Sequence, residues 1–199
     1  MNVAERLFAQ KGFDGTSVRD IAEDAVVNPS MISYYFGSKE GLMQALFQER
    51  TGHIGLKLEE LSLDDSLSPM EKVEALIGDY VERSLQKRLF YIILVTEQML
   101  QKNDVISGLI NDLKKRNIEF LETIINEGQR KGVFKQDIDI ALMMNTLVGT
   151  VTHTFINQSY YKSYHKLEAK SDDEFIVLLK NKLGNYIKDL FKSILSYEG

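Results

Sequence analysis

Apolar residues recur every three or four positions along almost the whole chain. This spacing places them on one face of an α-helix, so the pattern predicts an all-α protein. Only two prolines occur, Pro29 and Pro69. Each follows a residue that can cap a helix N-terminus, Asn28 or Ser68, and proline is well tolerated at the first helical position.

The order of the expected helices divides the chain into a small head and a larger body. In the first part, helices are expected at 2–11, from a cap at Thr16 or Ser17, at 29–36, and from a cap at Ser38 through Leu58. After a polar linker at 61–67, helices are expected from Pro69, at 89–102, 105–131, 137–159 and 172–196, with a Tyr- and Lys-rich connection at 160–171. The predicted domains are a three-helix head, residues 1–46, and a helical body, residues 47–199.

The second and third helices of the head are joined by Ala25, Val26 and Val27, which is the length of the turn in a helix-turn-helix. A short, stiffly capped helix with Ser and Tyr on its outer face fits the major groove, where hydroxyls bond base edges or phosphates. The alternative is a plain three-helix core in which Tyr34 and Tyr35 only pack. The pattern alone leaves both interpretations open.

One long segment, AERLFAQKGFDGTSVRDIAEDAVVNPSMISYYFGSKEGLMQAL (residues 4–46), resembles the DNA-binding head of the TetR family of bacterial regulators. The LF…KGF ending of the first helix, the TSVRDIA second helix and the YYF-x-SKE-x-L junction appear in register. GVFKQDIDIALMMNTLVGT (residues 132–150) resembles the family's body more loosely. The resemblance implies an all-α homodimer with an N-terminal head that binds double-stranded DNA and a C-terminal body for ligand binding and dimerisation.

The resemblance also implies roles for individual residues of the head. Arg19 would reach the DNA backbone or a base edge, and Lys39 would contact a phosphate. The recognition helix supplies the remaining candidates, Pro29, Ser30 and Met31 at its front and Ser33, Tyr34 and Tyr35 on its later turn. Many relatives have Tyr where this chain has Ser33.

A second departure from the family pattern is Val26, where many relatives have glycine. The residue at this place often has a left-handed backbone, which a β-branched side chain rarely adopts. We therefore expect a different path for the turn, with a negative φ at Val26 and its side chain packed toward the first helix.

Charge does not support DNA binding. The net charge is −5, and residues 1–50 hold five Lys and Arg against seven Asp and Glu, whereas a basic surface is the usual mark of a DNA-binding protein. The simplest account is a basic leader ahead of Met1, which we state as an expectation. The chain has no cysteine, and neither a signal peptide nor an apolar run long enough to cross a bilayer is visible. We expect a cytoplasmic protein with no membrane partner.

Two late helices carry long apolar stripes that suit pairing between subunits. The expected interface residues are Gly149, Thr152, Leu183, Tyr186, Ile187 and Leu190. The alternative is that both helices only cover their own core. A dimer would place two recognition helices about one DNA turn apart, roughly 34–36 Å, on a near-palindromic site.

A set of aromatic, Met and amide side chains in the body suits an apolar cavity with a few polar groups. These residues are Tyr80, Tyr91, Gln98, Met99, Asn117, Phe120 and Met143. The alternative for each of these residues is that it only packs in a filled core. The expected ligand is a small, largely apolar effector.

No catalytic triad, phosphate loop or metal-ligand cluster is visible, so neither an enzyme nor a cofactor is expected. The predicted function is a ligand-responsive transcriptional regulator, a repressor, that binds its operator as a homodimer. The rival hypothesis is a dimeric small-molecule-binding protein whose head no longer reads DNA.

Overall fold

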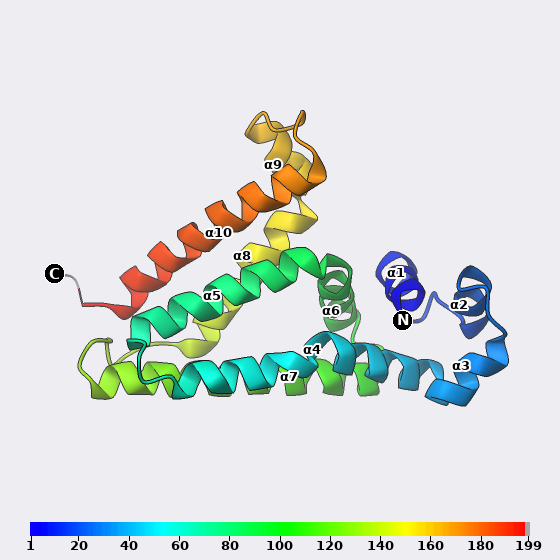
Figure 1. The fold of residues 1–199 in the computed structure, drawn as a ribbon, viewed down its shortest axis with the longest axis horizontal. Helices are drawn as coiled ribbons and strands as arrows, with labels where there is room; N and C mark the ends of the chain where they lie inside the picture. Colours follow the sequence, from blue (N-terminus) through cyan, green and yellow to red (C-terminus); the bar gives the residue numbers. More distant parts are fainter. Residues whose placement is uncertain (198–199) are drawn as a thin grey trace. The chain divides into compact units, whose positions relative to one another are not determined.

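The computed structural model describes residues 1–197, apart from the side chain of Leu56. These residues form helices and no strands, which confirms the all-α prediction. The helices in this range are α1 (Asn2–Lys11), α2 (Val18–Asp24), α3 (Pro29–Phe36), α4 (Lys39–Leu63), α5 (Pro69–Gln86), α6 (Arg88–Leu100), α7 (Asp104–Arg130), α8 (Ile140–Ile156), α9 (Gln158–Tyr164) and α10 (Asp172–Leu195) (Figure 1).

The chain divides into two compact units, and α4 and α7 contribute residues to both. One unit contains residues 1–56 and 89–116, and the other contains residues 57–88 and 117–197 of the described chain. The predicted division at residue 46 concerns function rather than compactness, and it stays a prediction.

Local signals start and end the helices of the head. Gly12 follows α1 with a φ of 73°, and Gly37 follows α3 with a φ of 75°. Ser17 and Asp20 form a reciprocal capping box at the start of α2, which satisfies two backbone donors. Asn28 caps α3 by accepting a hydrogen bond from the N–H of Ser30. The buried core of the head consists of Ala4, Leu7, Phe8, Phe13, Ile21, Ala22, Ile32, Leu42, Met43 and Leu46.

The first unit is completed by α6, which packs on the first half of α4. The rings of Phe47 and Phe90 meet edge to face with centroids 5.1 Å apart. Arg50 of α4 forms a two-pronged hydrogen bond with Glu5 of α1, with distances of 3.1 and 2.7 Å. The first half of α4 is therefore joined to both α1 and α6.

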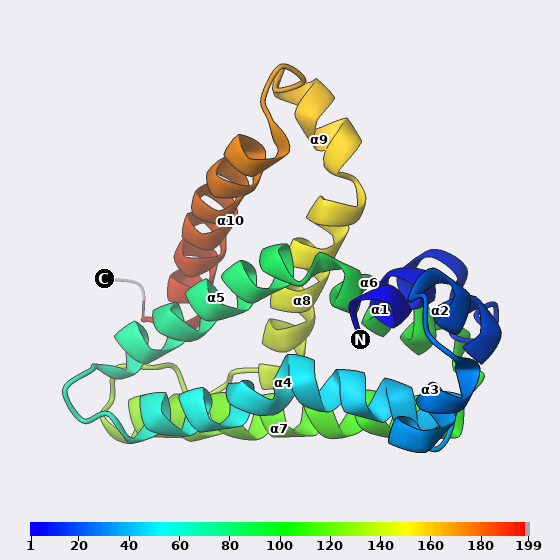
Figure 2. The same cartoon turned by 45° about the vertical axis from the view of Figure 1, so that its right-hand side comes forward.

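In the second unit, α10 packs on α5 and α8; it lies beside α5 in Figure 1 and crosses one end of α5 in Figure 2. Capping boxes begin α5 at Ser68 and Glu71 and α10 at Ser171 and Glu174. The buried side of α10 repeats every four residues, which is the spacing of one helix face; its members are Phe175, Leu179, Leu183, Ile187, Phe191 and Leu195.

Two stretches differ from the sequence-based expectations. Residues 160–164, expected as part of a connection, lie in the short helix α9, in which the rings of Tyr160 and Tyr164 stack one turn apart. The helix expected at 137–159 is shorter and begins at Ile140, because the side chain of Asp139 caps it. Within the described part of the chain, no helix combines the length and the apolar character needed to cross a bilayer.

Candidate DNA-binding head and ligand pocket

The turn between α2 and α3 closes a helix-turn-helix. The N–H of Val26 donates to the carbonyl of Glu23, and the N–H of Val27 donates to the carbonyl of Ala22, at 3.1 and 2.9 Å. Ile32 is the buried residue of α3. Almost the whole of α3 is therefore available for contact with another molecule.

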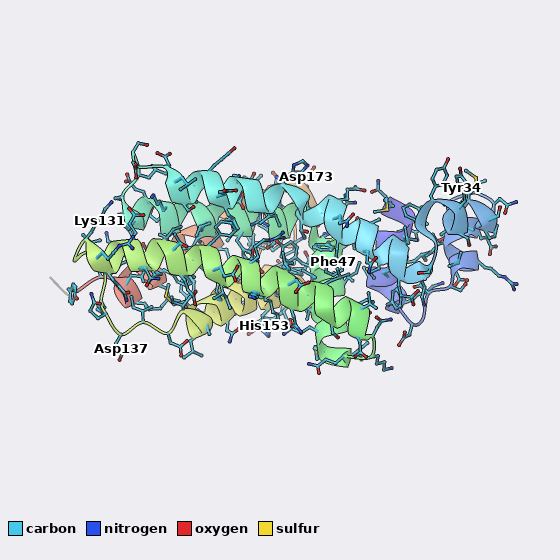
Figure 3. All side chains as sticks on the ribbon, turned by 90° about the horizontal axis from the view of Figure 1, so that it is seen from below. Tyr34, Phe47, Lys131, Asp137, His153 and Asp173 are labelled. Carbon is cyan, nitrogen blue, oxygen red and sulfur yellow. The ribbon has the colours of Figure 1, made fainter. Side chains whose placement is uncertain are left out.

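The exposed face of α3 holds every residue that was predicted for the recognition helix. Tyr34 is 82% exposed and lies on the outer side of α3 (Figure 3). Its ring meets the ring of Tyr35 edge to face, with centroids 5.1 Å apart. Pro29, Ser30, Met31 and Ser33 are also exposed. A short helix that presents hydroxyls, aromatic rings and a thioether suits contacts to base edges and thymine methyl groups.

Ser30 is already engaged at the front of α3. Its hydroxyl donates to Oδ1 of Asn28 at 2.8 Å, and its backbone N–H donates to the same oxygen at 2.9 Å. With its proton used in this way, the Ser30 oxygen is left as an acceptor, which suits an amino group of adenine or cytosine.

Val26 contradicts the expectation of a negative φ and a packed side chain. Its φ is 54°, and its side chain is 90% exposed. The turn follows the left-handed path that glycine usually takes, because the hydrogen bonds of Val26 and Val27 to the end of α2 require it. A β-branched residue in this conformation is strained by about 1–3 kcal/mol.

Three of the five cations in residues 1–50 are bound within the protein. Arg6 pairs with Asp24 at 2.9 Å, and Arg50 pairs with Glu5 at 2.7 Å. Lys39, predicted to contact phosphate, donates to the backbone carbonyls of Phe13 and Thr16 at 2.8 and 3.0 Å. Lys11 and Arg19 are exposed and form no ion pair with the described residues of the head.

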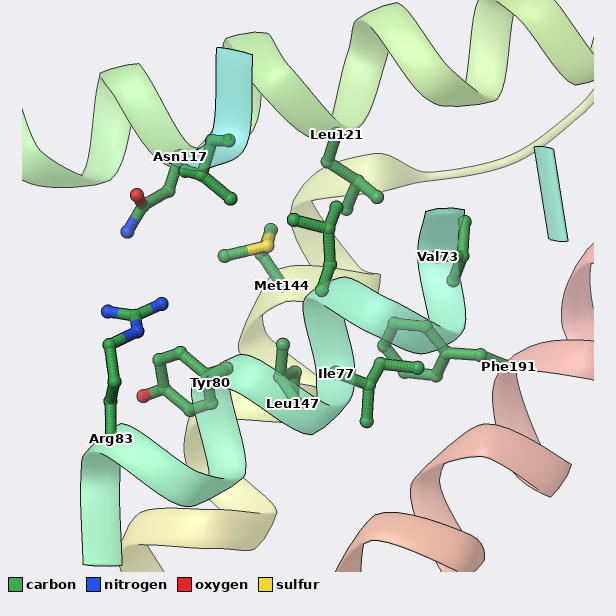
Figure 4. A pocket seen from close by; sticks show the side chains of 11 residues that line it. Val73, Ile77, Tyr80, Arg83, Asn117, Leu121, Met144, Leu147 and Phe191 are labelled. Carbon is green, nitrogen blue, oxygen red and sulfur yellow. The ribbon is translucent and has the colours of Figure 1, made fainter. Parts of the chain in front are cut away.

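A small cavity lies inside the second unit, between α4, α5, α7, α8 and α10. Its volume is ≈ 40 Å³, which is room for a few water molecules at about 10–15 Å³ each. The walls are mostly apolar, with the polar groups of Arg83, Asn117 and Tyr80 at one end and Val73 and Phe191 at the other (Figure 4). The remaining lining residues are Leu58, Leu76, Ile77, Leu121, Met144 and Leu147.

Asn117 gives this pocket an unpaired polar group. Its Oδ1 is buried and has no hydrogen-bond partner within the described residues, a state that costs free energy unless a ligand or water supplies a donor. The guanidinium of Arg83 is held by Asp79 of the same helix, with its Nε 2.5 Å from Oδ2 of Asp79. The pocket is thus apolar along most of its length and polar at one end.

The predicted ligand-binding set is only partly brought together. Tyr80 and Asn117 line the pocket. Phe120 and Met143 lie on α7 and α8 but do not line it, because the helix turns their neighbours Leu121 and Met144 inward. Tyr91, Gln98 and Met99 belong to the first unit, and Met99 is 80% exposed. These five residues are therefore not part of this pocket.

Sequence reasoning missed Arg83 as a pocket residue. Val73, Leu76, Ile77 and Tyr80 of α5 repeat at helical spacing, and Arg83 continues the same series one turn later. The sequence signal that could have identified Arg83 is a cationic residue at the next helical position of an apolar stripe.

The predicted interface residues fall on two different faces. Gly149 and Tyr186 are exposed, whereas Thr152, Leu183 and Ile187 are buried within the chain and Leu190 is half-buried. Leu183 and Ile187 lie on the face of α10 that packs on α5 and α8 within one chain. An exposed stripe on α8 remains, formed by Leu142, Asn145, Gly149, His153 and Ile156.

The exposed recognition helix and the pocket in the second unit define a helix-turn-helix regulator with a separate ligand-binding unit. Residues 1–46 match the model of the bacterial regulatory proteins of the tetR family. Residues 47–181 match the C-terminal region of the YsiA-like proteins. The chain belongs to the tetR family of bacterial transcription regulators.

Individual relatives agree with this assignment. The chain is 27% identical over 155 residues to the fatty acid metabolism regulator protein of Bacillus subtilis, covering 77% of this chain and 78% of the relative. The structure of FadR from Bacillus subtilis in complex with stearoyl-CoA is similar in fold, with a TM-score of 0.66, 24% identity and 94% coverage of each chain. The ketosteroid regulator KstR2 of Mycobacterium tuberculosis has a TM-score of 0.72 at 20% identity, over 99% of this chain and 93% of the other.

Proposed function

We propose that this protein is an effector-responsive repressor that binds a near-palindromic operator as a homodimer in the cytoplasm. The observation that carries the proposal is the exposed face of α3, where Ser30, Tyr34 and Tyr35 stand free of the head's core. A helix held at one end of a small core, with its polar face outward, suits insertion into the major groove.

The exposed stripe of α8 supports the homodimer. Leu142 and Ile156 are 62% and 53% exposed, and Gly149 between them allows close approach of another helix, since nothing lies within 4 Å of a Cβ built there. The neighbouring helix α10 adds Val177 and Tyr186, each 61% exposed. A twofold axis beside α8 and α10 would bury these apolar groups in both subunits.

The pocket supports an effector with a long apolar part and a hydrogen-bonding polar end. Its apolar walls suit an acyl chain, and the Asn117–Arg83 end suits a polar group. Because sites for drug-sized ligands measure about 300–1,000 Å³, such a ligand must displace side chains; Met144 is the most adaptable of them. We propose a long-chain acyl-CoA, the class to which the stearoyl-CoA of the FadR relative belongs.

Two measurements test the proposal. The protein is expected to select, from a random DNA library, near-palindromes with half-sites about one helical turn apart. Stearoyl-CoA is expected to weaken binding to the selected DNA, whereas CoA alone is not. Met144→Trp, which fills the pocket, is expected to bind DNA normally and to lose the response.

The head's shortage of unpaired cations favours a second candidate, a ligand-binding protein with a silent head. In that case stearoyl-CoA would bind, and no DNA sequence would be enriched in the selection. A response to a keto steroid in place of stearoyl-CoA would retain the repressor and replace the effector, as the similarity to a ketosteroid regulator suggests.

A further inference from the structure

The peptide group of Phe13, in the loop between α1 and α2, is held by charged side chains from two other helices. Its N–H donates a 2.9 Å hydrogen bond to Oε1 of Glu97 on α6. Its carbonyl oxygen accepts a 2.8 Å hydrogen bond from Nζ of Lys39 at the start of α4. All of these residues belong to the first compact unit. We call this set of two hydrogen bonds the Phe13 clamp.

Burial makes the Phe13 clamp hard to break. Glu97 is 5% exposed and Phe13 is 2% exposed, so a shift of the loop away from α6 would leave a carboxylate buried without its donor, which is costly. Hydrogen bonds to charged groups are also stronger than neutral ones. The Phe13 ring is fixed as well, because it lies against Phe8 at 5.5 Å and under the Lys39 ammonium at 4.1 Å.

The clamped loop leads directly into the helix-turn-helix. Lys39 also binds the carbonyl of Thr16 at 3.0 Å, and the Thr16 hydroxyl donates to the carbonyl of Gly12 at 2.9 Å. The next residue, Ser17, caps α2, and α2 packs on the recognition helix α3. A displacement of Phe13 is therefore passed to α2 and α3.

The chain also joins α6 directly to α5, a helix that lines the pocket. Arg83 and Tyr80 of α5 line the pocket, and only Lys87 separates the end of α5 from the start of α6 at Arg88. A ligand that displaces the last turns of α5 would therefore displace α6, which carries Glu97.

We propose that Glu97 is a positioning residue that couples α6 to the DNA-binding head through the Phe13 clamp. The head is thereby attached to α4 by Lys39 and to α6 by Glu97 at one peptide group, so a movement of α6 against α4 shifts the loop that carries α2. This role rests on the proposed function, because it assigns to Glu97 the passage of the effector signal to the operator-binding helix.

The test compares Glu97→Leu, which removes the acceptor, with Glu97→Gln, which retains a carbonyl oxygen for the Phe13 N–H. Lys39→Met, which removes the donor to the Phe13 carbonyl, is the third variant. Hydrogen exchange of the Phe13 amide is measured without DNA or ligand. The dissociation constant for the DNA that the wild type selects is measured with and without stearoyl-CoA, and melting temperatures are recorded for every variant.

In Glu97→Leu the Phe13 amide is expected to exchange at least about tenfold faster, because local opening then costs less. The effector-induced change in DNA affinity, about 5–150-fold in typical allosteric proteins, is expected to fall below about threefold. Glu97→Gln is expected to keep both wild-type values, and Lys39→Met to lose most of the effector response.

An unchanged effector response in Glu97→Leu would overturn the proposal even if the melting temperature fell, because a merely structural hydrogen bond changes stability and not the ratio of affinities. If the wild type ignores stearoyl-CoA, the proposed effector class has failed. The role of the Phe13 clamp is then tested by DNA binding in the absence of ligand. A DNA affinity that differs at least about fivefold between Glu97→Leu and Glu97→Gln supports the positioning role of Glu97, and equal affinities refute it. If Glu97→Leu does not fold, Lys39→Met decides by the same criteria.

Discussion

Val26 shows how one residue can hold a conformation that its side chain disfavours. The backbone at this position is left-handed, with φ at 54°, and the exposed side chain gains nothing from packing in return. Val27, the next residue, is not in the left-handed region and is 38% exposed. The two valines of one turn therefore differ in what they contribute to stability.

Val26→Gly is expected to raise the free energy of unfolding by about 1 kcal/mol. Release of strain, about 1–3 kcal/mol, outweighs the added entropy of the unfolded chain, about 0.4–1 kcal/mol. The melting temperature should rise by about 2–4 °C. Val27→Gly is the control and is expected to lower it, since no strain is released there. A lower melting temperature for Val26→Gly would contradict the assignment of backbone strain to Val26.

At the scale of helices, α5 and α7 are joined by an ion pair whose lysine is buried and whose glutamate is partly exposed. Lys72 is 1% exposed and donates from Nζ to Oε2 of Glu127 and to the carbonyl of Ser62, both at 2.9 Å. Glu127 also accepts from Lys131 at 2.6 Å. The hydrogen bonds from Lys131 and Lys72 hold the pKa of Glu127 below its ordinary value of 4.5.

Glu127→Gln is expected to destabilise the protein by about 3 kcal/mol, because it leaves the Lys72 ammonium buried without a counter-charge. Glu122→Gln, an exposed change on the same helix, is the control and should alter stability by less than about 0.5 kcal/mol. Chemical denaturation of both variants measures the difference, and equal stabilities would contradict the assigned role of the pair.

The lowered pKa of Glu127 also predicts the pH dependence. The folded carboxyl binds its proton less tightly than the unfolded one, so the contribution to stability is present above pH 4.5 and is lost as pH falls through the lower folded-state pKa. Denaturation between pH 7 and 3 should therefore show a steeper loss for the wild type than for Glu127→Gln. If stability fell with pH equally in the wild type and in Glu127→Gln, other carboxyl groups would determine the acid dependence of stability.

At the scale of the whole molecule, the exposed stripe of α8 is the surface that dimerisation would cover. Gly149→Arg is expected to give monomers in sedimentation, because a long charged side chain in the centre of the interface would lack a partner. Gly108→Arg on α7 is the matched control, since both glycines are exposed and neither has an atom within 4 Å of an added Cβ. If the Gly149→Arg variant were still a dimer, the interface would not include the exposed stripe of α8.

The paired cations of the head predict a weak dependence of DNA binding on salt. With Lys11 and Arg19 as the available cations of each head, a dimer neutralises about four phosphates, which gives a slope of about −4 in a plot of log affinity against log salt. Arg19→Ala should reduce its magnitude by about two units. A slope near −8 would show that Lys39 and Arg6 leave their partners to bind phosphate.

The sequence by itself determined most of the helices and most of their ends, because these depend on neighbours a few residues away; α9 and the start of α8 were the exceptions. Ser17, Asn28, Ser68 and Ser171 cap helices through backbone groups two or three positions ahead, and an apolar repeat of three or four residues is readable from the order of the residues alone. The exposed residues of the recognition helix followed from the same local pattern, together with the family resemblance.

Tertiary structure alone decided the partners of Lys39 and Glu97, which lie 26 and 84 residues away from Phe13. It also decided which face of α10 is buried, since an apolar stripe suits a subunit interface as well as a core and the packing on α5 and α8 made the choice at Leu183 and Ile187. The full set of pocket residues could not be predicted from the sequence for the same reason. The walls of the pocket come from five helices, and packing, rather than any local sequence preference, sets the distances between these helices.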